Sequence, residues 1–311
     1  MAEPDISVII TTYNVERYIE RALRSALDQQ GITLEVILVD DCSTDNTWNA
    51  VSKITDNRIK CFRLDKNSGP SVARNTGIEK ASGAWIAVLD GDDAFLPGRL
   101  TRCLAHAKTH HADIVVDNLN IHREADGAEF PMFPPAQFSK LTRLDLATFI
   151  RGTLTAFSNY TLGYLKPVFS AEFLRKHKLA YDPDIRIGED YMLLCEALAS
   201  GAHCAVEQTA GYVYTVRSGS ISHRLSLANI SRMLEVDAKF LAHYKLDQVS
   251  AKAQQNRESY LKKEYAYTLL VDAIKQGSIR DALKAIASRP ACVWLLRRPL
   301  WVRLHRLLKH C

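Results

Sequence analysis

Acidic side chains that could hold a cation occur in two clusters near the start of the chain. Asp40-Asp41 ends one short apolar run, and Asp90-Gly91-Asp92-Asp93 ends another. Carboxylates that lie close together repel one another, so a fold tolerates them best with a cation among them. Mg2+ and Mn2+ take oxygen ligands, often beside substrate phosphates. The clusters therefore predict a divalent cation site; the alternative is that these acids cap the helices that follow.

Three further segments carry side chains suited to anion binding or proton transfer. Residues 67–75 form a glycine turn followed by a helix start, and Arg74 there could neutralise a phosphate or clamp an acidic strand end. Gly188-Glu189-Asp190 begins another helix, where the dipole favours acids; an acid facing the clusters would be a candidate general base. Residues 217–223 offer an arginine, hydroxyls and a histidine, which suits either a surface turn or a phosphate-binding loop.

These polar segments lie at the ends of elements that alternate along the first 120 residues. Short apolar runs rich in Val and Ile predict buried parallel strands over residues 6–12, 34–40, 59–64, 84–90 and 113–117. Helical spacing lies between them, over residues 15–29, 45–54, 70–81 and 97–110. Repeated β-α-β units predict an α/β fold with a doubly wound, mostly parallel, Rossmann-like sheet. Ligands of such sheets bind beyond the carboxyl ends of the strands, where the acidic clusters are expected.

The rest of the chain predicts a mixed region and then a helical extension. Residues 122–140 contain three prolines and are expected to form a loop. Short strands are expected near 203–206 and 211–216, and the pattern after Ser226 is helical almost to the end, with a break at Gly277. We therefore expect a catalytic domain over residues 1–225 and a helical extension over residues 226–311.

Composition narrows the classes of function. The chain has 311 residues, of which 47% are hydrophobic and 24% charged, which excludes a disordered protein. Its seven cysteines are scattered without a C-x-x-C pair, so neither a zinc site nor a disulfide framework is expected. The net charge is +5, yet six Lys and Arg lie between Arg289 and His310, so the rest is near neutral and nucleic-acid binding is not expected. We expect neither a signal peptide nor a bilayer-spanning segment.

Five segments, in order, resemble the family 2 inverting glycosyltransferases of GT-A fold. They are ISVIITTYN, VDDCSTDNT, GPSVARN, LDGDD and GED, beginning at residues 6, 39, 69, 89 and 188. The resemblance covers residues 5 to about 223 and not the last part of the chain. It implies a GT-A domain over residues 1–225, with a nucleotide-binding half over 1–120 and an acceptor half over 121–225.

The resemblance also implies roles for individual residues. It assigns a nucleotide-sugar site to Thr12, Tyr13, Asp41, Arg74, Asp90, Asp92, Arg217 and Ser220. Within this set, Tyr13 is similar to the aromatic residue that packs on the base, and Asp41 to the acceptor of the uracil N3 proton. A divalent metal, Mg2+ or Mn2+, is expected on Asp92, Asp93 and His223. Asp190 is similar to the general base that takes the acceptor proton during one in-line displacement.

The activity that this resemblance implies is transfer of a single sugar from a nucleotide-diphosphate sugar, such as UDP-glucose, with inversion. The expected acceptor is a lipid-linked oligosaccharide in exopolysaccharide or cell-surface glycan synthesis. The Q-x-x-R-W segment of the processive synthases is absent, which favours single addition. One alternative is a non-catalytic sugar-nucleotide or membrane-binding module, which would not need Asp190. A dinucleotide-dependent oxidoreductase is disfavoured because Thr11-Thr12-Tyr13-Asn14, rather than G-x-G-x-x-G, follows the first strand.

The end of the chain predicts a membrane-binding helix. One stripe would carry the apolar residues Leu300, Trp301, Leu304, Leu307 and Leu308, and the opposite side Arg303, Arg306, Lys309 and His310. A basic amphipathic helix with Trp and Leu suits the headgroup region of an anionic leaflet. We therefore expect a cytoplasmic protein bound peripherally to the inner face of the membrane; the alternative is that this helix packs on the catalytic domain.

Overall fold

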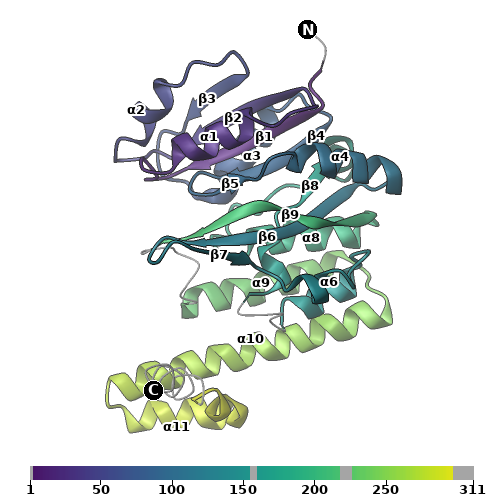
Figure 1. The fold of residues 1–311 in the computed structure, drawn as a ribbon. Coiled ribbons are helices and arrows are strands. Elements are labelled where there is room, and N and C mark those ends of the chain that lie inside the picture. Colours follow the sequence, from purple (N-terminus) through teal and green to yellow (C-terminus); the bar gives the residue numbers. More distant parts are fainter. Residues whose placement is uncertain (1–2, 155–159, 218–225, 297–311) are drawn as a thin grey trace, which may run out of the picture. The chain divides into compact units, whose positions relative to one another are not determined.

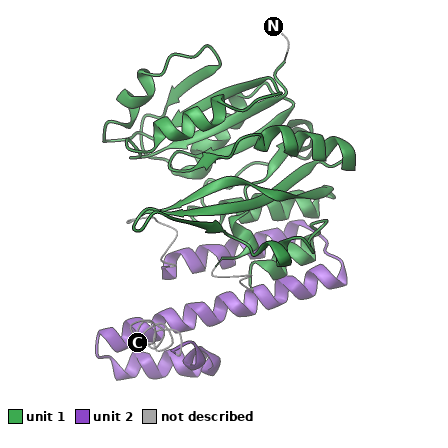
Figure 2. Cartoon of the chain, viewed as in Figure 1, with its two compact units in different colours: residues 1–220 green, residues 221–311 purple. Residues whose placement is uncertain are grey.

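The computed structural model describes residues 3–154, 160–217 and 226–296. The chain divides into two compact units, Met1–Ser220 and Ile221–Cys311, which Figure 2 colours separately. The N-terminal unit contains the sheet and the acidic clusters, and the C-terminal unit is helical in its described part.

The sheet of the N-terminal unit has nine strands among the described residues, and eight of them follow the order β3-β2-β1-β4-β8-β6-β9-β5. Its first four neighbours run parallel: β3 (Ile59–Arg63), β2 (Leu34–Asp40), β1 (Ile6–Thr12) and β4 (Trp85–Asp90) (Figure 1). β2 is buried along its whole length, which explains its continuous apolar sequence. The register pairs Thr12 with Asp40 and Thr11 with Asp90, so both acidic clusters flank the carboxyl end of β1.

The second half of the sheet is less regular. β8 (Val168–Ser170) runs antiparallel to both β4 and β6 (Ile114–Arg123), while β6 runs parallel to β9 (Cys204–Val216). The short strands β5 (Ala94–Phe95) and β7 (Ala128–Pro131) pair antiparallel with β9 and β6. The sheet is therefore mixed but mostly parallel, as expected.

Helices connect these strands. The longer ones are α1 (Ile19–Leu27), α3 (Pro70–Lys80), α4 (Arg99–His110) and α8 (Glu189–Ala199). The shorter ones are α2 (Thr47–Ser52), α5 (Pro135–Phe138), α6 (Leu146–Gly152), η1 (Leu162–Tyr164) and α7 (Ala171–His177). α3 packs on β1 and β2, and a Cβ atom on Gly77 would collide with the side chain of Ile9. This close approach places the preceding turn of α3, with Arg74, at the carboxyl edge of the sheet.

Two expectations for this unit were wrong. Residues 122–140 are not a loop, because β6 continues to Arg123 and turns back into β7. The prolines do not break this hairpin, since Pro131 is the last residue of β7 and Pro135 the first of α5. The two strands expected near 203–206 and 211–216 are one strand, β9, whose pairing with β6 shifts register between Asp117 and Leu119.

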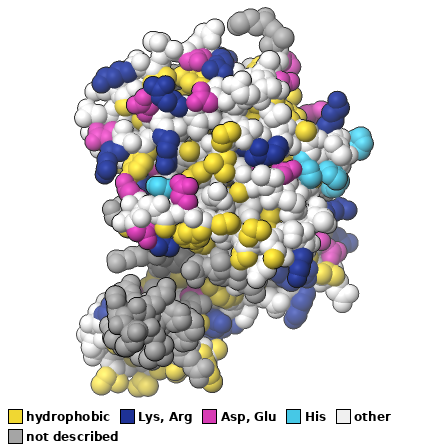
Figure 3. Space-filling model, in the orientation of Figure 1, with side chains coloured by type: hydrophobic (Ala, Val, Ile, Leu, Met, Phe, Trp, Pro, Cys, Tyr) yellow, Lys and Arg dark blue, Asp and Glu magenta, His cyan; other side chains and the backbone are white. Residues whose placement is uncertain are grey.

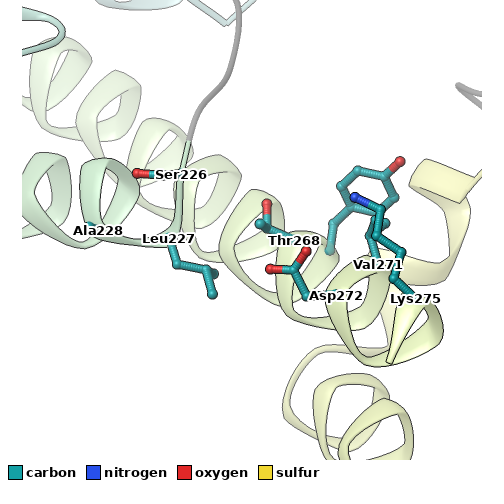
Figure 4. Close-up of a pocket in the computed structure, with 8 residues that line it drawn as sticks. Ser226, Leu227, Ala228, Thr268, Val271, Asp272 and Lys275 are labelled. Atoms are coloured by element: carbon teal, nitrogen blue, oxygen red, sulfur yellow. The ribbon is translucent and has the colours of Figure 1, made fainter. Parts of the chain in front are cut away.

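The C-terminal unit consists of α9 (Leu227–His243), α10 (Gln248–Lys275), α11 (Ile279–Ser288) and the 3-10 segment η3 (Pro290–Leu296) in its described part. The expected break at Gly277 separates α10 from α11. Buried Ala266, Leu270, Ala285 and Cys292 join α10, α11 and η3. A cavity of about 660 Å³ lies between the start of α9 and α10, where Leu227 faces Thr268, Val271 and Asp272 (Figure 4).

Two properties bear on the expected partners. No helix within the described ranges is both long and apolar enough to cross a membrane. The amphipathic helix expected after Pro299 lies outside those ranges. On the face that Figure 3 shows, basic and acidic side chains are interspersed over the N-terminal unit.

Candidate functional site

The site is built where β1, β2 and β4 end. Asp40, the last residue of β2, is fully buried, and its carboxylate accepts a hydrogen bond from the Thr12 hydroxyl at 2.9 Å and pairs with Arg63 at 3.2 Å. The next residue, Asp41, accepts backbone N–H bonds from Ser68 at 2.6 Å and Gly69 at 2.8 Å. Asp40 and Asp41 thus join the ends of β1 and β2 to the turn that starts α3.

Thr12 and Tyr13, which are both expected to contact the nucleotide, differ in solvent exposure. The hydroxyl of Thr12 is engaged by Asp40, and this residue is 2% exposed. Tyr13 is 42% exposed, which leaves its ring accessible at the rim of the site. Asp41 retains further lone pairs for another donor, because two carboxylate oxygens offer about four acceptor positions.

Arg74 brings together acids from distant parts of the chain. Its guanidinium, 3% exposed, contacts Asp90 at 2.7 Å, Glu189 at 2.7 Å and Asp190 at 3.0 Å. Gly188 precedes the two helical acids with a φ of 89°, a backbone conformation that favours glycine, and this turn starts α8 next to Arg74. The D-G-D-D and E-D segments, about 100 residues apart in the sequence, therefore meet at one arginine.

Lys166 is a second cation of the site, and the sequence analysis missed it. Its Nζ lies 2.8 Å from Asp90 and 2.8 Å from Asp190. The only signal in the sequence is a lysine between Leu165 and the apolar run that begins at Pro167. Lysine is almost never fully buried without a partner, so this position indicated a buried acid nearby without saying which one.

The pKa values of the acids in the site are shifted in opposite directions. Burial alone would raise the pKa of Asp90, but Lys166 and Arg74 hold it well below its ordinary value. Burial and the neighbouring charges of Asp92 and Asp90 raise the pKa of Asp93 well above its ordinary value. Burial likewise raises the pKa of Glu189, although Arg74 opposes the shift. Carboxylates packed this closely repel one another, and either protonation or a bound divalent cation relieves that repulsion.

Asp92 and Asp93 are adjacent but have different surroundings. Asp93 is 1% exposed, and its oxygens contact the Tyr212 hydroxyl at 2.7 Å and the Thr215 N–H at 2.8 Å. Asp92 is partly exposed; one oxygen accepts from Arg217 Nε at 2.7 Å, and the other accepts no bond from the residues that the structure describes. Neither Tyr212 nor Thr215 was singled out from the sequence, because β9 carries no motif that marks them.

A divalent cation fits this donor set through Asp92. Asp92 is partly exposed, its second oxygen accepts no bond from the described residues, and carboxylate oxygens are the hard ligands that Mg2+ and Mn2+ prefer. Within the described part of the chain, no three His, Cys, Asp or Glu residues are arranged to hold a metal by themselves. Such ions commonly take their remaining ligands from water and substrate phosphates. The other expected residues of this region, Ser220 and His223, lie outside the described residues.

The chain is similar to known proteins both in sequence and in fold. The family model described as Glycosyl transferase family 2 matches residues 7–170. The succinoglycan biosynthesis protein ExoO of Rhizobium meliloti strain 1021 is 42% identical over 98% of this chain and 87% of its own length.

Two solved structures share the fold. The S. aureus TarS fragment 1–349 in complex with UDP-GlcNAc has a TM-score of 0.66 at 21% identity, covering 92% of each chain. The mannosyltransferase PcManGT from Pyrobaculum calidifontis, in complex with GDP-Man and Mn2+, has a TM-score of 0.64 at 19% identity and covers 98% of this chain and 81% of that one. These similarities confirm the expected mixed α/β fold with C-terminal helices.

Proposed function

The chain belongs to glycosyl transferase family 2, and we propose that it transfers one sugar, with inversion, from a nucleotide-diphosphate sugar to an acceptor hydroxyl in exopolysaccharide or cell-surface glycan synthesis. The observation that carries this proposal is the meeting of the D-G-D-D and E-D segments at Arg74 and Lys166. This arrangement brings an acidic donor motif and a candidate base into one site at the carboxyl edge of the sheet.

A uridine diphosphate hexose, such as UDP-glucose, is the proposed donor. The TarS fragment of the same fold binds UDP-GlcNAc, which supports a uridine nucleotide. Tyr13 would pack on the base, Asp41 would accept its N3 proton, and Asp90 would contact the donor near the ribose. Arg74 supplies positive charge at the same edge. The nucleotide would then occupy the half of the domain formed by residues 1–120, and the acceptor would approach from residues 121–225.

A divalent metal is proposed at Asp92. PcManGT, of the same fold, is solved with Mn2+ and a nucleotide sugar. The metal supplies Lewis-acid stabilisation of the negative charge that grows on the departing diphosphate. Arg217, already 2.7 Å from Asp92, adds a protein cation at the same place. Asp93 and His223 remain proposed as further ligands.

Asp190 is the proposed base. Its carboxylate lies on the same side of the site as Asp90 and is bound by Lys166 and Arg74, so its position is defined before any substrate binds. A carboxylate in this position takes the proton of the acceptor hydroxyl as the oxygen attacks the sugar. Displacement in one step then inverts the anomeric centre without a covalent intermediate on the chain.

The test is a donor screen. The protein is incubated with a panel of nucleotide sugars and Mg2+ or Mn2+, and release of the free nucleotide diphosphate is measured. Turnover of one donor, dependent on metal, supports the proposal. Tight nucleotide binding without turnover of any donor, with lipid-linked acceptors present, would instead favour a non-catalytic sugar-nucleotide module.

A lipid-linked acceptor would place the enzyme at a membrane. We propose peripheral attachment to the inner face through the basic residues near the C-terminus, with lipid-linked oligosaccharide as the acceptor. The similarity to ExoO, whose name assigns it to succinoglycan biosynthesis, supports a role in exopolysaccharide assembly.

A further inference from the structure

Four charged side chains of the site form a closed ring of ion pairs. Arg74 contacts Asp90 at 2.7 Å and Asp190 at 3.0 Å, and Lys166 contacts the same two acids at 2.8 Å each. We call Arg74, Asp90, Lys166 and Asp190 the ion-pair ring. Each acid uses one oxygen for the arginine and the other for the lysine. A carboxylate held at both oxygens cannot turn about its Cβ–Cγ bond without breaking an ion pair.

Lys166 is fixed at its backbone as well as at its ammonium group. The Lys166 carbonyl accepts a hydrogen bond of 2.6 Å from Arg99. Arg99 is in turn paired with Asp117 through two bonds of 2.9 and 2.7 Å, and both residues are 1% exposed. A buried arginine pair of this kind loses much solvation, so its cost is offset only by well-made contacts.

Aromatic rings complete this support. The Arg99 guanidinium lies 4.8 Å from the ring centroid of Phe95 and 5.2 Å from that of Tyr212. Tyr212 also contacts Asp93 through its hydroxyl at 2.7 Å. The same buried layer therefore holds both the donor motif and the lysine of the ion-pair ring.

Neutralising Asp90 does not by itself require Lys166, because Arg74 already contacts that acid. What Lys166 adds is a second contact to Asp190 from another element, which fixes the direction of the carboxylate. Misplacement of a reacting group by about 1 Å can cost 10²-fold in rate. Orientation of the base is thus the property that this lysine controls.

We propose that Lys166 is a positioning residue of sugar transfer, which fixes the Asp190 carboxylate and couples it to the donor motif at Asp90. The proposal rests on the function proposed above, in which Asp190 is the base. It predicts that loss of Lys166 lowers turnover much more than it lowers donor affinity.

The experiment uses full-length protein and hydrolysis of the nucleotide sugar that the donor screen identifies, with water as acceptor. Turnover and KM for the donor are measured for Lys166→Met, Lys166→Gln and Lys166→Arg. Lys60→Met is the matched control, because Lys60 pairs with buried Glu35 at 2.7 Å on β2, outside the ion-pair ring. Thermal melting shows which variants fold.

We expect Lys166→Met to lower kcat by about 10²-fold, with a much smaller change in KM. Lys166→Arg, which keeps the positive charge, should retain more of the wild-type kcat than Lys166→Met does. Lys166→Gln, which keeps an N–H donor without the positive charge, replaces Lys166→Met as the uncharged variant if the Met variant does not fold. In the folded uncharged variant, a KM raised as far as kcat is lowered, or a kcat equal to that of Lys60→Met, overturns the proposal. Absence of turnover in the wild type rejects the proposed function itself, and this inference with it.

Discussion

Arg217 donates from its Nε to the Asp92 carboxylate at 2.7 Å. Arg217 directly follows β9, and its guanidinium also lies 5.3 Å from the ring of Tyr18. This ion pair joins the acidic end of β4 to the first residue of segment 217–223, the candidate phosphate-binding loop. A divalent cation on Asp92 would compete with the guanidinium for the same carboxylate, so we expect metal binding and the position of Arg217 to depend on each other.

The first prediction follows from this pair. Asp92→Asn removes the charge of a partly exposed acid whose second oxygen accepts no bond from the described residues, so metal-dependent donor binding is lost while the fold is retained. Titration calorimetry with UDP, with and without Mn2+, measures the loss. Asp93→Asn, measured in parallel, shows whether the buried acid is a second ligand.

A control for that prediction is Asp126→Asn, because Asp126 is an exposed acid paired with Arg123 in the β6–β7 turn. It should bind UDP and metal as the wild type does. If Asp92→Asn keeps full metal dependence, the assignment of the metal to Asp92 is wrong.

The second prediction concerns the proposed base. Asp190→Asn should lower turnover by roughly 10²-fold or more, with donor affinity nearly intact, because a base acts in the transition state and not in donor binding. Steady-state release of nucleotide diphosphate and calorimetry separate the two effects. Glu196→Gln, on the same helix α8, serves as the matched control. Parallel loss of turnover and donor affinity would make Asp190 a structural or donor-binding residue instead.

The third prediction tests membrane attachment. The six cations between Arg289 and His310 should bind anionic vesicles in a salt-sensitive way. The truncated protein ends at Leu296, so that it retains Cys292 and Leu295, which are buried in the C-terminal unit. Full-length protein should float with anionic liposomes and the truncated protein should not. Equal flotation of both, or of neither, would reject attachment through residues 297–311.

The fourth prediction concerns acid stability, away from the proposed site. Glu35 is buried, and burial alone would raise its pKa, but hydrogen bonds from Lys60, Ser7 and Ser82 outweigh this effect and lower the pKa to about 2. Glu35→Gln should therefore lower the free energy of unfolding at pH 7 by about 1 to 3 kcal/mol.

The pH dependence of that loss has a definite sign. Since the pKa of Glu35 is lower in the folded chain than the ordinary value of 4.5, its contribution is complete above that value and disappears as the pH falls toward 2. Urea unfolding at several pH values should show the wild type and the variant converging below pH 4.5. A difference that stays constant down to acid pH would contradict the role of the ionised carboxylate.

Several features of this protein were determined by the sequence alone. Buried parallel strands require continuous apolar runs, so β1, β2 and β4 were recognisable within a residue or two. Helix starts were recognisable at Pro70 and Glu189 because proline and acids favour the first turn. Since parallel strands end at one edge, the sequence also indicated that Asp41 and Asp92 lie at the same edge of the sheet. The structure added that β1 lies between their two strands.

Only the tertiary structure decided which side chains pair. Lys166, Arg99 and Tyr212 carry no local signal, because their roles depend on acids that lie far away in the sequence. The difference between Asp92 and Asp93 is likewise invisible in the sequence: one is partly exposed beside Arg217, and the other is buried against β9. Periodicity reports whether a position is buried, whereas hydrogen-bond partners, exposure and pKa depend on packing between elements that the chain brings together only when it folds.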